Sequence, residues 1–305
     1  MKAKLTLLSI LLFTITITSY GQAVEGTTPA VSIKVGTQPA PVVADPVVNK
    51  AEEQSRVTLE TLGITNLPKY HALIIGVSEY DNAGSEFPNL EMPAKDAEKL
   101  YELLTENYAF DKQNTTLLKN PTREQMINQF DRLIHEVDKT DNLLVFYAGH
   151  GYYDKRTDFG FWLPSDAKTT SRSDWIANST IKDYIGAIKT KHTLLITDAC
   201  FGGSIFKTRS VGTIMKRFNE LYVVNSRKAI TSGNLTEVPD NSIFLKYLLK
   251  SLGENQDVFL SSSQLFTRIY EPILNNSPST PQFGVIQGAG DEGGDFVFIS
   301  RKGQF

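Results

Sequence analysis

A cysteine and a histidine in this chain have the chemistry of a catalytic pair. Cys200, the only cysteine, follows the apolar run 193–197 by three residues and precedes a phenylalanine and two glycines. His150 stands between two glycines, just after the apolar run 142–148. An apolar run that ends at glycines is typical of a buried strand that leads into an exposed turn. We therefore expect two strands that each present one reactive side chain.

This pair is suited to attack on a carbonyl group. A cysteine thiol has an ordinary pKa near 8.5, so only a few per cent is thiolate at neutral pH, and a nearby imidazole increases its reactivity. His150 can also protonate an amine leaving group. The backbone N–H groups of Gly151 and Cys200 can donate to the developing oxyanion. The residues predict acyl transfer, most simply peptide-bond hydrolysis. A lone cysteine that only fills a core gap is the structural alternative, but such a position does not require the glycines that follow.

The elements around the pair alternate between strand and helix patterns. We expect strands at residues 70–77, 115–118, 142–148, 193–199, 229–231 and 296–299, a hairpin at 159–163, and helices that begin near residues 93, 122, 181, 242 and 262. This order predicts an α/β fold with a mostly parallel sheet and helices on both faces. If the strands before His150 and Cys200 are parallel neighbours, both residues lie at the same edge of the sheet.

The first 67 residues have a different composition. Two lysines precede the apolar stretch 5–17, which is too short for a membrane span of roughly 20 residues, so we expect residues 1–21 to be a cleaved export signal. Residues 22–67 are rich in Pro, Val and Thr and are expected to be a flexible linker. The expected product is a periplasmic or secreted protein without a stable membrane span, whose globular domain occupies residues 68–305.

Charge and composition exclude several classes of site. The formal net charge is −3, and the sequence contains no stripe of basic residues. Both observations disfavour nucleic acid as a partner. One cysteine and four scattered histidines do not form a standard zinc cluster. We expect no cofactor.

The segments Tyr147–Gly151 and Asp198–Gly203 resemble the histidine and cysteine motifs of the caspase-like cysteine peptidases, the family of caspases and metacaspases. The resemblance runs from about Tyr70 to the end of the chain. It implies a caspase-like sandwich with about six sheet strands, a large-subunit-like part at 68–206, a small-subunit-like part at 207–305, and a Cys/His dyad. It also implies protein or peptide substrates.

Two acids imply a preference for basic substrates. Caspases carry a glutamine two residues before the cysteine, where this chain has Asp198. Metacaspases are more similar here, with an acid at this position and another at the start of the first helix, which Asp96 matches. The resemblance therefore predicts cleavage after Arg or Lys. The structural alternatives are a helix N-terminal acid for Asp96 and a turn-capping acid for Asp198.

Calcium activation and self-cleavage are two further features that the resemblance raises. Metacaspases often bind calcium, but Asp154, Asp158 and Asp166 fit no recognisable loop pattern, so no metal site is expected. Basic residues in the segment 207–228, which is expected to be irregular and exposed, are candidate self-processing points: Lys207, Arg209, Lys216, Arg217, Arg227 and Lys228. A catalytically silent caspase-like binding module and an acyl transferase that uses the same dyad are the alternative functions.

Overall fold

The computed structural model describes residues 67–199, 218–233 and 240–303, all within one compact unit, Ala51–Phe305. The predicted nucleophile Cys200 lies outside the described residues, as do the expected signal segment and almost all of the expected linker. In the part of the chain that is described, no helix has the length and apolar character needed to cross a membrane.

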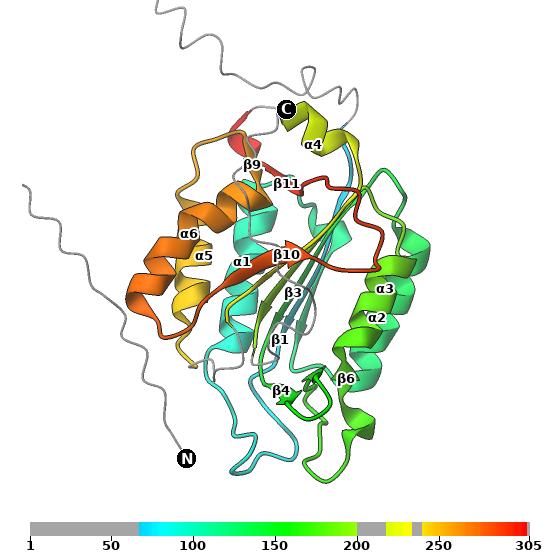
Figure 1. Cartoon of the computed structure of the whole chain (residues 1–305), viewed down its shortest axis with the longest axis vertical. Coiled ribbons are helices and arrows are strands. Elements are labelled where there is room, and N and C mark those ends of the chain that lie inside the picture. The colour runs from blue at the N-terminus through cyan, green and yellow to red at the C-terminus, as the bar shows by residue number, and fades with distance from the viewer. Residues whose placement is uncertain (1–66, 200–217, 234–239, 304–305) are drawn as a thin grey trace, which may run out of the picture. The chain divides into compact units, whose positions relative to one another are not determined.

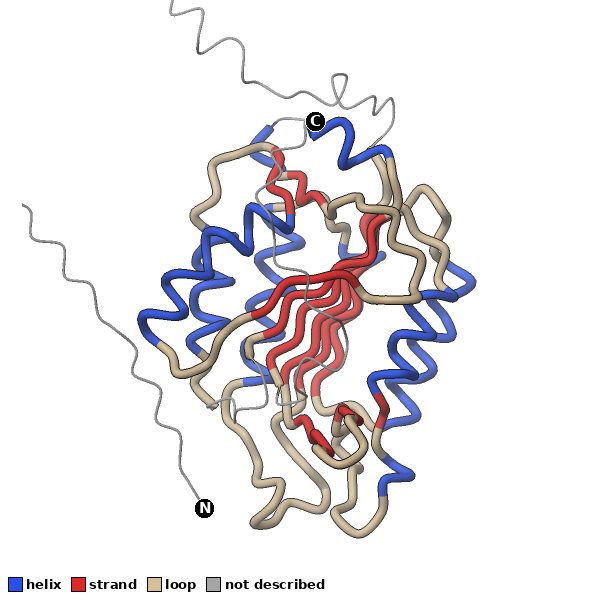
Figure 2. The backbone as a smooth tube through the Cα atoms, in the orientation of Figure 1, coloured by secondary structure: helices blue, strands red, loops and turns tan. Residues whose placement is uncertain are grey.

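A six-stranded sheet forms the centre of the domain (Figures 1 and 2). Its strand order is β10-β8-β7-β3-β1-β2, and every pairing is parallel except that of β10 with β8. The strands are β1 (Tyr70–Gly76), β2 (Thr115–Lys119), β3 (Asn142–Ala148), β7 (His192–Asp198), β8 (Ser226–Thr231) and β10 (Gln282–Val285). The predicted mostly parallel sheet is confirmed.

The central strands are apolar because both faces of the sheet are covered. Every residue of β1, β3 and β7 is buried, as expected for parallel strands between two helical layers. Successive side chains point to opposite faces, so Ile74 contributes to one core and Ile75 to the other.

The helices pack in two layers (Figure 1). Helices α1 (Pro93–Asn107), α5 (Ile243–Gly253) and α6 (Ser262–Asn276) cover one face, and α2 (Arg123–Glu136) and α3 (Asn178–Ala187) cover the other. Helix α4 (Phe218–Val223) is short, and single 3-10 turns occur at Lys112–Asn114, Arg172–Asp174 and Arg301–Gly303. The helix starts agree with the sequence signals: Pro93 opens α1, and Thr122 and Ser261 form capping boxes.

Two small sheets lie outside the main one. Strands β4 (Gly151–Asp154), β5 (Phe159–Trp162) and β6 (Ile176–Ala177) form an antiparallel three-stranded sheet that begins directly after His150. The segment 159–163, which was expected to form a hairpin, contributes only one strand of it, β5, and β4 is the other strand. The predicted last strand is β11 (Val297–Ile299), which pairs with β9 (Phe259–Ser261) and not with the main sheet.

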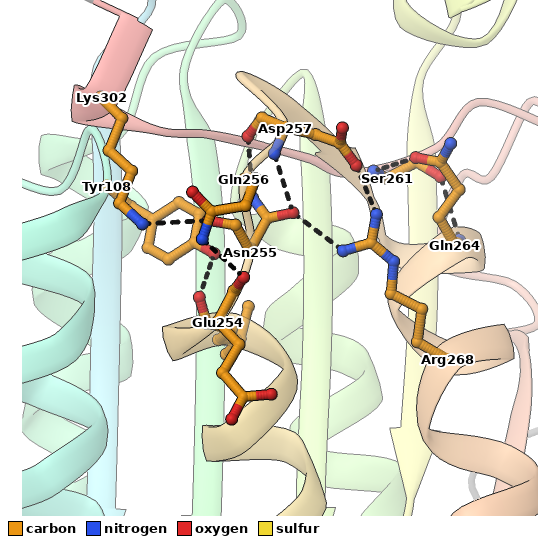
Figure 3. Close-up of polar contacts among 10 residues, drawn as sticks. Tyr108, Glu254, Asn255, Gln256, Asp257, Ser261, Gln264, Arg268 and Lys302 are labelled. Atoms are coloured by element: carbon orange, nitrogen blue, oxygen red, sulfur yellow. Dashed lines mark hydrogen bonds and ion pairs between the residues drawn. The ribbon is translucent and has the colours of Figure 1, made fainter.

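Polar contacts fix the connection between α5 and β9 (Figure 3). The guanidinium of Arg268 donates to Asn255 Oδ1 at 2.8 Å and also binds Asp257. Lys302 Nζ donates to the Asn255 carbonyl at 3.2 Å, and Tyr108 Oη donates to the carbonyl of Leu252 at 2.7 Å. These contacts attach α6 and the C-terminal turn to the end of α5.

The expected exposure of Arg227 and Lys228 is wrong. Both residues belong to β8, and Arg227 is only 5% exposed. Its guanidinium donates to the main-chain carbonyls of Ser226 and Thr190, at 2.7 and 3.0 Å. The strand therefore begins earlier than the basic residues suggested, and main-chain carbonyls accept hydrogen bonds from part of the buried guanidinium. These two positions are not accessible cleavage points in the folded domain.

Candidate active site

The ends of β3 and β7 are direct neighbours at one edge of the sheet. In their parallel register, Ala148 pairs with Asp198, and the Gly149 N–H donates to the Asp198 carbonyl at 3.4 Å. His150 follows the last residue of β3 by two positions, and Cys200 follows the last residue of β7 by two positions. The expectation that the two runs are parallel neighbours ending at one edge is confirmed, whereas Cys200 itself lies outside the described residues.

Two tyrosine hydroxyls hold the backbone of His150. The His150 N–H donates to Tyr80 Oη at 2.7 Å, and Tyr147 Oη donates to the His150 carbonyl at 2.6 Å. Gly149, the preceding residue, has φ of +153°, and a Cβ there would lie 3.1 Å from both hydroxyls. A side chain at position 149 would therefore strain the backbone and crowd both contacts.

A loop that follows the neighbouring strand β1 at the same edge of the sheet orients the imidazole. His150 Nε2 lies 2.7 Å from the carbonyl oxygen of Pro88. Because a carbonyl can only accept, Nε2 carries the proton, and Nδ1 is the acceptor in the neutral ring. The ring also lies against Tyr80 and Phe87, with centroids 5.0 and 5.9 Å away.

This loop, residues 78–90 between β1 and α1, is a part of the site that sequence reasoning missed. Asn120 Oδ1 accepts from the Ser78 N–H at 2.8 Å, and the Leu90 N–H donates to the Ser78 carbonyl at 2.8 Å. Asn89 Oδ1 accepts from the Tyr80 N–H at 2.8 Å. The loop is thus closed on itself and attached to the sheet. No periodicity or motif in residues 78–90 indicated that they support the histidine.

Asp198 is a buried acid at the end of β7, and its side chain is only 5% exposed. Burial raises its pKa to about 6, the hydroxyls of Ser242 and Ser232 oppose the rise, and the charge of Asp96 adds to it. Its Oδ1 atom has no hydrogen-bond partner among the described residues. A buried carboxylate with unused acceptor capacity is suited to bind a donor from a ligand.

Asp96 lies in the first turn of α1 and is buried beside Lys99, whose Nζ is 2.9 Å from Asp96 Oδ1. Its effect on the Asp198 pKa places the two acids in one electrostatic environment. The packing of α1 on β1 sets this position, because a Cβ at Gly76 would lie 2.4 Å from the Pro93 oxygen. The two acids that the sequence predicted are therefore electrostatically coupled through the pKa of Asp198.

A third acid, Asp240, also lies at the start of α1 and was not predicted. Its carboxylate accepts from the N–H groups of Glu91 and Met92, at 2.8 and 2.9 Å. These contacts join the residue that follows the segment 234–239 to the helix that carries Asp96. A lone aspartate after a proline gave no signal of this role in the sequence.

A family model decides the relationship of the chain. The model of the caspase domain, Peptidase_C14, matches residues 69–277. The chain belongs to the caspase domain family. Among solved structures, the crystal structure of protein GSU0716 from Geobacter sulfurreducens is similar, with a TM-score of 0.52 and 18% identity over 75% of this chain and 100% of that chain. No curated protein matches.

The acids considered for calcium in this caspase domain each have a protein partner. Asp154 binds Arg172 at 3.0 Å, Asp166 accepts from the Arg123 N–H at 2.8 Å, and Asp158 accepts from a tyrosine hydroxyl. Within the described ranges, no group of three or more His, Cys, Asp or Glu residues could hold a metal ion. The absence of a metal cofactor stays a prediction.

The other histidines of the caspase domain lie away from the edge that carries His150. His71 Nε2 is 3.1 Å from Asp141 Oδ2 in a buried pair near the start of β1. His192, the first residue of β7, is buried beside the Tyr222 carbonyl, and burial lowers its pKa to about 3. His135 lies exposed on α2. The geometry is consistent with their expected structural or surface roles.

Proposed function

We propose that this caspase-domain protein is a cysteine-type endopeptidase in which Cys200 is the nucleophile and His150 is the general base and acid. The observation that carries the proposal is the bond between His150 Nε2 and the Pro88 carbonyl, 2.7 Å long. It assigns the proton to Nε2 and leaves Nδ1 as the basic atom of the ring. Family membership supports a cysteine peptidase in general.

The proposed reaction has two stages. His150 Nδ1 takes the thiol proton, and the thiolate forms a bond to the carbonyl carbon while the carbonyl oxygen becomes an oxyanion. The N–H groups of Gly151 and Cys200 donate to this oxyanion. The imidazolium then protonates the amine as the C–N bond breaks. In the second stage the imidazole takes a proton from water, and the hydroxide displaces the sulfur.

We further propose that Asp198 and Asp96 select Arg or Lys on the acyl side of the cleaved bond. Both acids are buried, and their mutual repulsion contributes to the raised pKa of Asp198. A basic side chain would relieve this repulsion and satisfy Asp198 Oδ1. A charge-assisted hydrogen bond contributes about 1.5 to 3 kcal/mol, which corresponds to roughly ten-fold to hundred-fold in kcat/KM.

The test is peptide cleavage by the full chain. Substrates that differ only in the residue before the cleaved bond would carry Arg, Lys, Asp or Ala, each with and without calcium. Cys200→Ala and His150→Ala are expected to abolish cleavage, whereas the exposed-histidine control His135→Ala retains it. Faster turnover after Asp than after Arg would refute the specificity, and unchanged cleavage by Cys200→Ala would refute the mechanism.

The same proteins separate the alternative functions. Iodoacetamide labelling of Cys200 that slows in His150→Ala supports an activated dyad. A labelling rate that does not depend on His150, together with no cleavage of any peptide, favours a silent binding module. Products in which the acyl group is joined to an added amine favour an acyl transferase.

We also propose self-processing within residues 207–217, at one of the basic residues that the sequence places there. A preference for Arg or Lys would make these residues substrates of the protein itself. Wild type and Cys200→Ala would be compared by intact mass after purification. The expected result is a cleaved wild type and an intact variant, and a wild type that is as intact as the variant would overturn the proposal.

A further inference from the structure

A large cavity lies at the end of the sheet opposite His150. It has a volume of about 1040 Å³ and is lined by residues at the N-terminal ends of the parallel strands, among them Lys69 before β1, Asp141 before β3, Lys191 before β7, and Arg227 in β8. Helix α4 and the loop around Glu292 complete the lining. The proposed peptidase function uses none of these residues.

Positive charge predominates in this cavity. Its lining includes the cations Lys69, Lys139, Lys189, Lys191 and Arg227 but only the acids Asp138, Asp141 and Glu292. Asp141 is already engaged, because it pairs with His71 at 3.1 Å. Lys69, Lys139 and Lys189 form no ion pair with any described residue. An anionic occupant would therefore be attracted.

Arg227 is the buried cation of the cavity. Its guanidinium contacts only main-chain carbonyl oxygens in the described structure, and its pKa is lowered by burial, against the opposing charges of Asp291 and Glu292. A buried cation without a carboxylate in contact is costly. An acidic group placed in the cavity would offset part of that cost.

The rim of the cavity is apolar as well as basic. Leu67 is 43% exposed and Val223 is 62% exposed, and both line the cavity. They are two of the four large hydrophobic residues that are exposed in the described ranges. A suitable occupant combines carboxylates with aliphatic side chains.

We propose that the occupant is the chain's own segment 51–66, which directly precedes Leu67. This segment contains Glu52, Glu53 and Glu60 together with the aliphatic residues Val57, Leu59, Leu62 and Ile64. Its formal charge is −2, because Arg56 is its only cation, whereas residues 22–50 contain two acids and two lysines and are neutral. The segment with the complementary chemistry is thus the one nearest the cavity.

Covalent attachment makes such docking favourable. Each residue extends the chain by at most about 3.6 Å, so Glu60, seven residues before Leu67, reaches at most about 25 Å. A short tether gives an effective concentration in the millimolar range, so weak contacts suffice for occupancy. The docked segment would shorten the expected linker to residues 22–50. The inference does not depend on the proposed peptidase activity.

Zero-length carbodiimide coupling of the full Cys200→Ala chain tests the proposal, because the reagent joins a carboxylate and a lysine only when they are in contact. Peptide mapping is expected to find links from Glu52, Glu53 or Glu60 to Lys139 or Lys189. The exposed lysines Lys246 and Lys250 on α5 are the matched controls. Links that are absent, or equally frequent at the control lysines, would overturn the proposal.

Two further arms make the result decisive. A mixture of ¹⁵N-labelled and unlabelled chains shows whether a link joins one chain or two, and links between chains would overturn docking within the chain. In the Glu52→Gln/Glu53→Gln/Glu60→Gln variant, acetylation of Lys139 and Lys189 by an activated ester is expected to accelerate at least three-fold, relative to the controls. Unchanged acetylation rates would contradict the proposal.

Discussion

Replacement of Asp198 by Asn is expected to stabilise the fold while impairing the proposed activity. Burial raises the Asp198 pKa from 3.8 to about 6, so the folded protein binds this proton more tightly than the unfolded chain does. As the pH rises from about 4 to 6, the unfolded chain releases the proton first and wild-type stability falls. Above pH ~6, the full pKa shift lowers the free energy of unfolding of the wild type by about 3 kcal/mol. The Asp198→Asn variant does not lose this stability, because the asparagine side chain does not ionise.

Calorimetry at about pH 4 and pH 8 measures this difference. Asp198→Asn and wild type are expected to unfold at similar temperatures at the lower pH, whereas at the higher pH the variant is expected to unfold several degrees later. The exposed-acid control Asp183→Asn should show no such pH dependence. At about pH 8, cleavage after Arg by Asp198→Asn is expected to fall roughly ten-fold to hundred-fold. Equal destabilisation at both pH values would refute the reasoning, because it would make Asp198 a structural hydrogen-bond partner.

Three other substitutions test the positions of the elements around the site. Gly149→Ala is expected to destabilise the domain by about 1–3 kcal/mol in urea unfolding, since φ of +153° strains any residue with a side chain and the added methyl group would crowd two hydroxyls 3.1 Å away. A urea midpoint of Gly149→Ala equal to that of the wild type would contradict the expected destabilisation. Thr122→Ala removes the side-chain cap of α2, and a loss of about 1 kcal/mol is expected in the same assay; no loss would show that the cap is dispensable. Arg268→Ala removes the donor to Asn255, and hydrogen exchange is expected to accelerate in residues 254–258 but not in β3. Uniform acceleration would point to global destabilisation instead.

Much of the fold was predictable because the central strands are simple in composition. β1, β3 and β7 are buried on both faces, so each is a continuous apolar run, and in the sequence glycines follow soon after β3 and β7. The edge strand β10 was missed. It has only four residues and pairs antiparallel with β8, so no long apolar run marks it.

The surroundings of the candidate site were less predictable than its chemical groups. His150 could be identified because a histidine between glycines is distinctive. The carbonyl of Pro88 and the hydroxyl of Tyr80 both contact His150, although they lie 62 and 70 positions before it in the sequence. Main-chain acceptors and loop tyrosines leave no periodic pattern in a sequence. The burial of Arg227 was missed for a similar reason, since its partners are carbonyl groups that every residue carries.

The close approach of α1 to the sheet at Gly76 has a consequence for how this protein can change its substrate preference. A methyl group at this position would collide with the backbone of Pro93 and Ala94, so the helix would have to move outward and take Asp96 with it. Selectivity for basic peptides, on the proposed function, is then tied to a residue that no substrate touches. A substitution at position 76 would therefore alter substrate recognition without touching the substrate. Mutant libraries that vary only Asp96 and Asp198 would overlook this position.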